Sequence, residues 1–145
     1  MSARGAMRMV RMRVPAGKAS PAPPVGPTLG QVGVNLMEFC KQFNAQTVNV
    51  KDGIELPVRV RAYADRTFDF EVTTPPTSFF LKRAAGVAKG ATQPGKETVG
   101  SVTLKQVYAI AQIKHKDQRL QRCSLESVAK QVAGTARTIG LEVVR

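Results

Sequence analysis

VAGTARTIG, at residues 132–140, keeps the apolar spacing of an α-helix although glycine, threonine and arginine interrupt it. A glycine inside a helix costs about 1 kcal/mol relative to alanine. A helix that tolerates this cost often lets another backbone approach it closely. Because the chain carries a formal net charge of +12, we predict that the approaching group is the backbone of a nucleic acid.

The helix around this run is predicted to have Ser124 as its N-cap. Its core stripe consists of Leu125, Val128, Val132, Ala136 and Ile139. At about 100° per residue, a second face holds Ser127, Gln131, Gly134 and Thr138, bordered by Thr135 on one side and by Lys130 and Arg137 on the other. Small residues and hydroxyls suit the shallow minor groove of RNA. The alternative is an ordinary solvated helix face.

Residues upstream of this helix predict two shorter helices joined by a long loop. The first covers about 77–85. The second starts at Thr103 and has Leu104, Val107, Tyr108 and Ile110 on its apolar face. Residues 86–100 between them show no apolar period, which indicates a loop with a function or a disordered one. At the end of the chain, residues 141–144 are expected to form a short strand or packing segment.

The first half of the chain predicts a small antiparallel sheet covered by one helix. Apolar residues alternate with basic ones over 7–14 and 56–63, and with acidic ones over 68–72, as in half-buried strands. Asn35 is the predicted N-cap of a helix that runs to about Ala45. The proline-rich run SPAPPVGP, at 20–27, is expected to be extended, because proline blocks both helix and sheet ladders.

The segment Thr73-Thr74-Pro75-Pro76 separates the two halves. We therefore predict an α+β fold with an N-terminal α/β domain at 1–72, a stiff linker at 73–76 and a compact three-helix RNA-binding domain at 77–145. Residues 1–74 contain 10 Lys/Arg and 6 Asp/Glu, a balance of +4. Residues 75–145 contain 12 and 4, a balance of +8, which makes the second half the better candidate for binding nucleic acid.

The sequence does not predict an enzyme, a metal site or a cofactor. His115 is the only imidazole, and no nucleophile or carboxylate is spaced around it as in a triad. The letters GATQPGK at 90–96 match a nucleotide-binding P-loop, but Glu97 stands where Ser or Thr is needed and no buried strand precedes the run. Cys40 and Cys123 fit no metal site and are interpreted as reduced thiols. No apolar run approaches the ~20 residues of a membrane span.

Several motifs closely resemble the L-eleven family of large-subunit ribosomal proteins, and they occur in the family's order from about Val10 to Val144. They are PAPPVGPTLGQ at 21–31, MEFCK at 37–41, TPP at 74–76, LKRAAG at 81–86 and GTAR at 134–137. The resemblance implies a two-domain protein at the base of the ribosomal stalk. In that family the C-terminal domain binds the GTPase-associated region of large-subunit rRNA, with its last helix against the RNA minor groove. The N-terminal domain is mobile and faces translational GTPases.

The resemblance also implies roles for individual residues. Gly134 and Thr135 would contact rRNA closely, with Gln131 and Thr138 on the same face, and the loop 86–100 would order on RNA. The candidate phosphate partners are Lys82, Lys89, Lys96, Lys114 and Arg137. Pro23, Pro24 and Pro27 resemble the wall of a cleft where thiopeptide antibiotics bind, and Lys41 matches a position that is methylated in some bacterial members. Neighbouring stalk-base ribosomal proteins are further expected partners.

Residues 105–122 look more like mitochondrial members of the family, and the most notable matches are VTLK at 102–105 and VY at 107–108. The first 37 residues contain arginines and no acid, which is a bias of organellar targeting segments. We therefore expect the large subunit of a mitochondrial ribosome, in the matrix, with the bacterial cytoplasm or a plastid as the alternative. The competing function is a non-ribosomal protein–protein adaptor that uses its proline-rich segment at 21–27.

Overall fold

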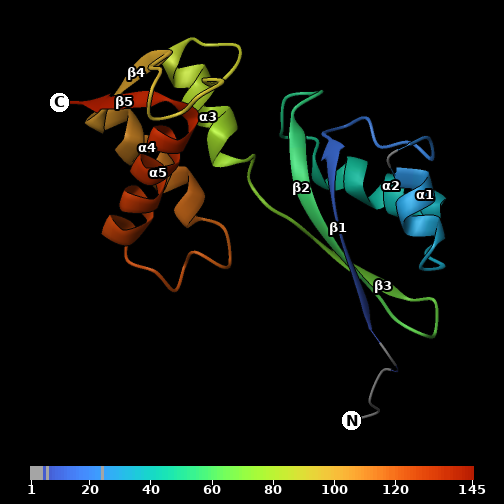
Figure 1. Ribbon diagram of the computed structural model, residues 1–145. Coiled ribbons are helices and arrows are strands. Elements are labelled where there is room, and N and C mark those ends of the chain that lie inside the picture. Colours follow the sequence, from blue (N-terminus) through green and yellow to red (C-terminus); the bar gives the residue numbers. More distant parts are fainter. Residues whose placement is uncertain (1–4, 6, 24) are drawn as a thin grey trace. The chain divides into compact units, whose positions relative to one another are not determined.

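The computed structural model describes residues 5, 7–23 and 25–145. The chain divides into two compact units, residues 1–73 and 74–145, and each has a hydrophobic core of its own (Figure 1). Both units combine helices with strands, so the predicted α+β class is confirmed. No helix in the described part of the chain is long and apolar enough to cross a membrane.

The described part of the N-terminal unit contains an antiparallel sheet in the order β1-β2-β3, with helices packed against one of its faces. Its elements are β1 (Arg8–Pro15), α1 (Val25–Gly30), α2 (Leu36–Gln46), β2 (Glu55–Ala62) and β3 (Phe68–Val72). The predicted alternation is confirmed, because Val14, Val58 and Val60 are buried while Arg11 and Arg61 are exposed on the other face.

Helix α2 forms as its sequence predicts. The side chain of Asn35 accepts a hydrogen bond from the backbone N–H of Glu38, as an N-cap does. Phe39 and Phe43 are completely buried, and the ring of Phe39 meets that of Phe70 on β3 edge-on, with centroids 5.3 Å apart. The Cys40 thiol lies in the same core, and burial raises its pKa. These contacts hold α2 on the inner face of the sheet.

The proline-rich run does not stay extended to its end, so that prediction is wrong for residues 25–27. Helix α1 starts at Val25, which places Pro27 in the first helical turn. Proline is tolerated there because the first N–H groups of a helix have no partner within it. A Cβ on Gly26 would overlap the carbonyl oxygen of Pro21, so the turn into α1 requires glycine.

The described part of the C-terminal unit contains the three predicted helices and also a short parallel pair of strands. Its elements are α3 (Thr77–Ala85), β4 (Gly100–Thr103), α4 (Leu104–His115), α5 (Leu125–Ile139) and β5 (Leu141–Val144). Strand β4 was not predicted, because it is too short to show a period and its partner β5 follows the last helix. Ser124 caps α5 as expected, since its hydroxyl oxygen accepts the N–H of Ser127 at 3.2 Å.

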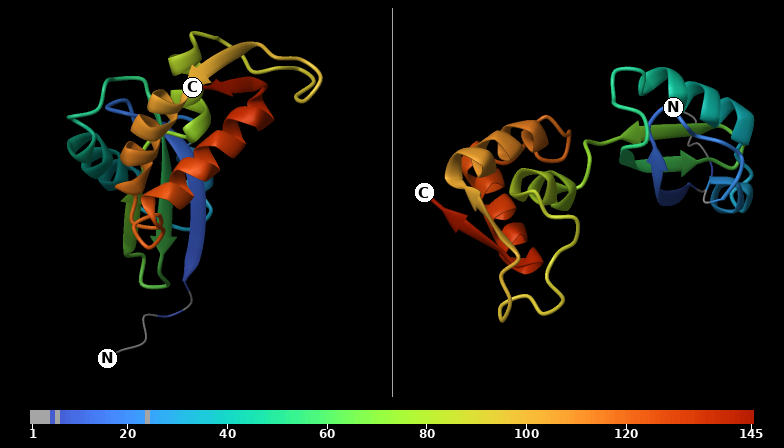
Figure 2. Two further views of the ribbon diagram at one scale, coloured as in Figure 1. Left: turned by 90° about the vertical axis from the view of Figure 1, so that its left-hand side faces the viewer. Right: turned by 90° about the horizontal axis from the view of Figure 1, so that it is seen from above.

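Helices α4 and α5 lie side by side (Figure 2). Their core includes Leu81, Val107, Val128 and Val132. The predicted apolar face of α4 is wrong at two of its positions. Leu104 and Tyr108 are 51% and 50% exposed. The buried arc is centred on Val107, Ile110 and Ala111 instead, which leaves Leu104 and Tyr108 at its edge.

Candidate nucleic-acid interface

Helix α5 presents a face of small and polar residues beside its buried stripe. Val128, Val132 and Ala136 are almost fully buried. Gln131, Gly134 and Thr138 are exposed, and Thr135 is half-buried. We call these last four residues the small-residue face. The two arcs predicted from the sequence therefore occupy different sides of the same helix.

Packing within the described part of the chain does not require glycine at position 134. Apart from the helix's own backbone and the two neighbouring residues of the chain, no described heavy atom lies within 4 Å of the place where its Cβ would stand. Its φ is not positive either, unlike that of Gly140 at the end of the helix. Since glycine destabilises a helix interior by about 1 kcal/mol relative to alanine, the helix gives up stability at Gly134 and leaves its backbone open to the outside.

The two threonines of the small-residue face are oriented by the helix itself. Thr135 Oγ1 donates to the carbonyl oxygen of Gln131 at 2.9 Å, and Thr138 Oγ1 donates to that of Thr135 at 2.7 Å. A hydroxyl that donates its single proton can still accept hydrogen bonds through its lone pairs. Both oxygens are therefore held as acceptors, which suits a partner that donates, such as a ribose 2′-OH.

The loop between α3 and β4 is docked against the end of α5. The N–H of Ala91 donates to the carbonyl oxygen of Ile139 at 2.8 Å, and the N–H of Val99 donates to that of Gly140 at 2.9 Å. These two bonds bring the segment with Lys89 and Lys96, both exposed, to the same end of α5 as Thr138. In sequence the loop and this helix end are far apart, so their proximity was not predictable from periodicity.

Two further predicted cations lie on helices of the C-terminal unit. Arg137 is exposed in the last turn of α5, where a cation also interacts favourably with the helix dipole. Lys82 is half-buried in the last turn of α3, which packs against α5.

Lys114 differs from the other candidate cations because its charge is already paired. Its ammonium lies 2.8 Å from the Asp117 carboxylate, with only 12% and 10% of the two side chains exposed. It also donates to the hydroxyl oxygen of Thr74 at 2.8 Å and to the carbonyl oxygen of Pro75 at 3.3 Å. Asp117 in turn accepts from the N–H and the hydroxyl of Thr74. The cluster of Thr74, Lys114 and Asp117 ties the start of the unit to the end of α4.

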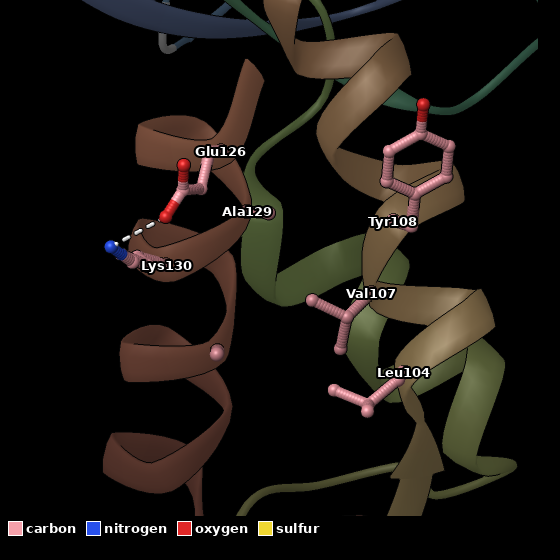
Figure 3. Close-up of a pocket in the computed structure, with 7 residues that line it drawn as sticks. Leu104, Val107, Tyr108, Glu126, Ala129 and Lys130 are labelled. Atoms are coloured by element: carbon pink, nitrogen blue, oxygen red, sulfur yellow. Dashed lines mark ion pairs between the residues drawn. The ribbon is translucent and has the colours of Figure 1, made fainter. Parts of the chain in front are cut away.

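On its other flank, α5 forms an apolar groove with α4 (Figure 3). Leu104, Val107 and Tyr108 line it from α4, and Ala129 and Ala133 line it from α5. Its volume is about 380 Å³. At its rim, Glu126 and Lys130 form an ion pair of 2.8 Å, which lowers the pKa of Glu126 and raises that of Lys130. This groove is separate from the small-residue face.

The candidate residues of the N-terminal unit lie on its helical layer. Pro23 is exposed just before α1, and Pro27 is exposed within it. Pro24 lies outside the described residues. Lys41 is exposed on α2. Proline and lysine thus gather on the side of the sheet that the helices cover.

The segment at 90–96, whose sequence matches a P-loop, does not have the structure of a phosphate-binding loop. The segment before it is α3, which ends at Ala85, and no described strand leads into it. Gly90 is needed for another reason, because a Cβ there would stand 2.8 Å from Ile139 Cγ2 and 3.1 Å from its carbonyl oxygen. The glycine therefore serves the docking of the loop on α5, a role that only the tertiary structure reveals.

Comparison with known proteins agrees with this architecture. The family model described as "Ribosomal protein L11, N-terminal domain" matches residues 10–68, and "Ribosomal protein L11, RNA binding domain" matches residues 73–143. Three similar proteins are each named large ribosomal subunit protein uL11. They come from Hydrogenobaculum sp. (strain Y04AAS1), Afipia carboxidovorans and Bradyrhizobium sp. (strain ORS 278).

The first of these relatives is 51% identical to this chain over 134 residues, which cover 92% of this chain and 91% of the relative. The other two are each 52% identical over 134 residues, which cover 92% of this chain and 93% of the relative. The alternative of a non-ribosomal adaptor is therefore wrong. The chain belongs to the ribosomal protein L11 family, and it is a structural component of the large ribosomal subunit with an RNA-binding C-terminal domain, not an enzyme.

Proposed function

We propose that the chain binds the GTPase-associated region of large-subunit rRNA at the base of the stalk, with the small-residue face of α5 against an RNA minor groove. The observation that carries this proposal is the exposed Gly134, whose missing side chain nothing in the described chain requires. A ribose-phosphate backbone can approach such a helix more closely than one with alanine at this position. The helix stability lost at Gly134 is then recovered in the complex.

In this proposal the helix recognises the shape of the RNA. The hydroxyl oxygens of Thr135 and Thr138 accept from ribose 2′-OH groups, and the exposed amide of Gln131 bonds to ribose or phosphate. Lys82, Lys89, Lys96 and Arg137 neutralise phosphates around the same helix. Lys114 acts indirectly by holding Thr74 in place, because Asp117 already neutralises its charge.

We further propose that the N-terminal unit faces translational GTPases and neighbouring stalk-base ribosomal proteins. The surface around Pro23 and Pro27 would face these partners and would form the wall of a thiopeptide-binding cleft. Pro24, which is predicted to act with them, lies outside the described residues. The exposure of Pro23 and Pro27 supports this assignment, because a rigid proline surface loses little entropy when it docks. Lys41, exposed on α2, is a candidate for methylation.

We propose the mitochondrial matrix as the location of this large subunit. The support comes from the sequence at 102–122 and from the acid-free first 37 residues. The assignment is tested by expressing the chain with a C-terminal fluorescent tag in cells of the organism from which it comes, where we expect fluorescence in mitochondria. Fluorescence in the cytoplasm of a bacterium or in plastids would contradict it.

The rRNA proposal is tested by binding of the full-length chain to an rRNA fragment of the GTPase-associated region. One fragment is folded with Mg²⁺, and a second carries base changes that abolish its tertiary fold but keep its length and charge. We expect the folded fragment to bind at least tenfold more tightly. Equal binding to both fragments would show that the contact is only electrostatic and would contradict shape recognition.

A further inference from the structure

The face of the N-terminal sheet that α1 and α2 leave uncovered carries four arginines. Arg11 and Arg13 belong to β1, and Arg59 and Arg61 belong to β2. Each alternates with a buried or half-buried apolar residue of the inner face, so all four side chains project to the outer side. We call this set the arginine face.

The strand register places like charges opposite one another on this face. Arg11 pairs directly with Arg59 across β1 and β2. Side chains in such a pair have Cβ atoms about 4.5–5.5 Å apart, and like charges there destabilise a sheet. Among the described residues, no carboxylate lies within ion-pairing distance of Arg11 or Arg13. On its other side, Arg59 stands directly opposite Glu71 of β3, and Arg61 stands opposite Asp69. The positive charge that has no acid opposite it in the register is therefore that of Arg11 and Arg13 on β1, where Arg11 faces Arg59 and Arg13 faces Pro57.

The remaining residues of the outer face favour a protein partner over a nucleic acid. Strand β3 adds Asp69 and Glu71, and Arg61 lies 4.0 Å from the Glu71 carboxylate. A chain of phosphates would meet repulsion from these acids, whereas a protein segment can match them with a basic or neutral residue. Met9 is 44% exposed on the same face, opposite Arg61. Methionine and arginine are both enriched at protein–protein interfaces, and lysine is depleted.

We propose that the arginine face docks an extended, acidic segment of another protein. Along β1, Arg11 and Arg13 are two residues apart, so their Cα atoms are separated by about 6.6–6.8 Å. Carboxylates on alternate residues of an extended peptide have the same spacing. Each can accept a bidentate pair of hydrogen bonds from one guanidinium, which fits arginine better than lysine. The inference is independent of the rRNA proposal, because it concerns another unit and another class of partner.

The test measures binding of the full-length chain to a synthetic peptide of alternating glutamate and threonine. The readout is NMR of the ¹⁵N-labelled protein, so that shifts on β1 and β2 are separated from those of the basic C-terminal unit. The double variant Arg11→Gln/Arg13→Gln is compared with Lys18→Gln/Lys51→Gln. The control lowers the net charge equally at exposed positions of the same unit.

We expect the peptide to shift the signals of β1 and β2 and the arginine variant to bind it about threefold to tenfold more weakly, while the lysine variant binds like the parent. The arginine variant should also unfold at a temperature about 1–4 °C higher in the N-terminal unit, because the repulsion between Arg11 and Arg59 is removed. A merely structural role for these arginines predicts the opposite shift in stability.

Three results would overturn the proposal. The peptide could fail to bind the arginine face, or the two double variants could weaken binding equally, which would reduce the effect to net charge. A single-stranded oligouridylate of the same length could bind through Arg11 and Arg13 while the peptide does not. That outcome would assign the face to nucleic acid instead of an acidic protein.

Discussion

Gly134 and Gly140 lie near the end of the same helix but are glycine for different reasons. A Cβ on Gly134 would point into open space. Gly140 has φ +91° and ends α5 in the left-handed conformation, and a Cβ there would overlap Cβ of Ala91 and lie 3.1 Å from the carbonyl oxygen of Glu97. Gly140 therefore serves the fold, whereas we propose that Gly134 serves contact with an external partner. Substitution separates the two roles.

We expect Gly134→Ala to stabilise the C-terminal unit and to weaken binding to the rRNA fragment. The helix gains up to about 1 kcal/mol from the better propensity of alanine. The affinity should fall about tenfold or more, because the added methyl group separates α5 from the RNA backbone. Thermal unfolding and fragment binding measure the two effects. Gln112→Ala, at an exposed position of α4, is the control that should leave the affinity unchanged. A Gly134→Ala variant with parental affinity would remove the proposed contact surface.

We expect Gly140→Ala to destabilise the C-terminal unit by about 1–3 kcal/mol, because strain in the left-handed region adds to the overlap with Ala91. Hydrogen exchange at the amides of Ala91 and Val99 should accelerate, since both donate to this end of α5. Gly95→Ala is the matched control, because Gly95 has φ +90° but no described atom within 4 Å of a Cβ. Equal effects of the two substitutions would show that loop docking contributes nothing.

At the scale of elements, two attachments organise the C-terminal unit. One docks the loop between α3 and β4 on the end of α5. The other is the cluster of Thr74, Lys114 and Asp117, which attaches the segment before α3 to the end of α4. Both join segments that are distant in sequence. The first attachment positions Lys89 and Lys96, which are candidate phosphate-binding residues. The second pairs Lys114 with Asp117, although the sequence predicted that Lys114 would bind phosphate.

We expect Asp117→Ala to destabilise the unit more than Asp117→Asn. The alanine removes the acceptor of the Thr74 N–H and the carboxylate that is paired with the largely buried Lys114 ammonium, and a buried group that loses its partner costs about 1–3 kcal/mol. The asparagine keeps a carbonyl oxygen for Thr74. Chemical denaturation measures the order of the two variants. Glu126→Ala, which removes the exposed pair with Lys130, should change stability little. If Asp117→Ala behaved like Glu126→Ala, the cluster would have no structural role.

We expect Lys89→Ala and Lys96→Ala each to reduce the salt dependence of fragment binding by about one counterion equivalent. Both lysines are exposed on the loop that is docked beside α5. The measurement is the slope of log affinity against log salt concentration. Lys105→Ala, exposed on α4, is the control with the same charge change. An unchanged slope in both loop variants would mean that the loop does not touch phosphate.

At the scale of the whole molecule, the chain consists of two units with separate cores and different charge chemistry. The C-terminal unit presents a small polar helix face with lysines around it. The N-terminal unit presents exposed prolines on its helical layer and arginines on its sheet. In our proposals, RNA is the partner of the C-terminal unit and proteins are the partners of the N-terminal unit. It predicts that changes in one unit leave the binding of the other unit's partner intact.

We expect the combination of Gly134→Ala with Arg11→Gln/Arg13→Gln to bind the rRNA fragment as Gly134→Ala alone does, within about 0.5 kcal/mol, because changes at distant sites without shared partners add independently. The affinity for the acidic peptide should likewise equal that of the arginine variant. The measurement is titration of the rRNA fragment and of the acidic peptide into four forms of the full-length chain: the parent, Gly134→Ala, the arginine variant and their combination. A coupling well above this limit would show that the two units communicate.

The local elements and their faces were predictable from the sequence because neighbouring residues decide them. The caps Asn35 and Ser124, the helical stripes that follow them and the alternation along β1 to β3 all depend on residues a few positions apart. Even the opposed faces of α5 follow from a period of 3.6 residues. The resemblance of the motifs then identified the family.

Only the tertiary structure decided the features that depend on specific contacts and not on a periodic pattern. It paired β4 with β5, placed the loop of Lys89 against α5 through Gly140, and neutralised Lys114 with Asp117 beside Thr74. It also starts helix α1 at Val25, within the proline-rich run, where the carbonyl oxygen of Pro21 leaves no room for a side chain at position 26. The physical reason is shared: hydrogen bonds, ion pairs and steric limits between particular groups depend on how the chain is packed and leave no periodic signal along it. This holds for partners 40 residues apart, such as Thr74 and Lys114, and for near neighbours such as Pro21 and Gly26.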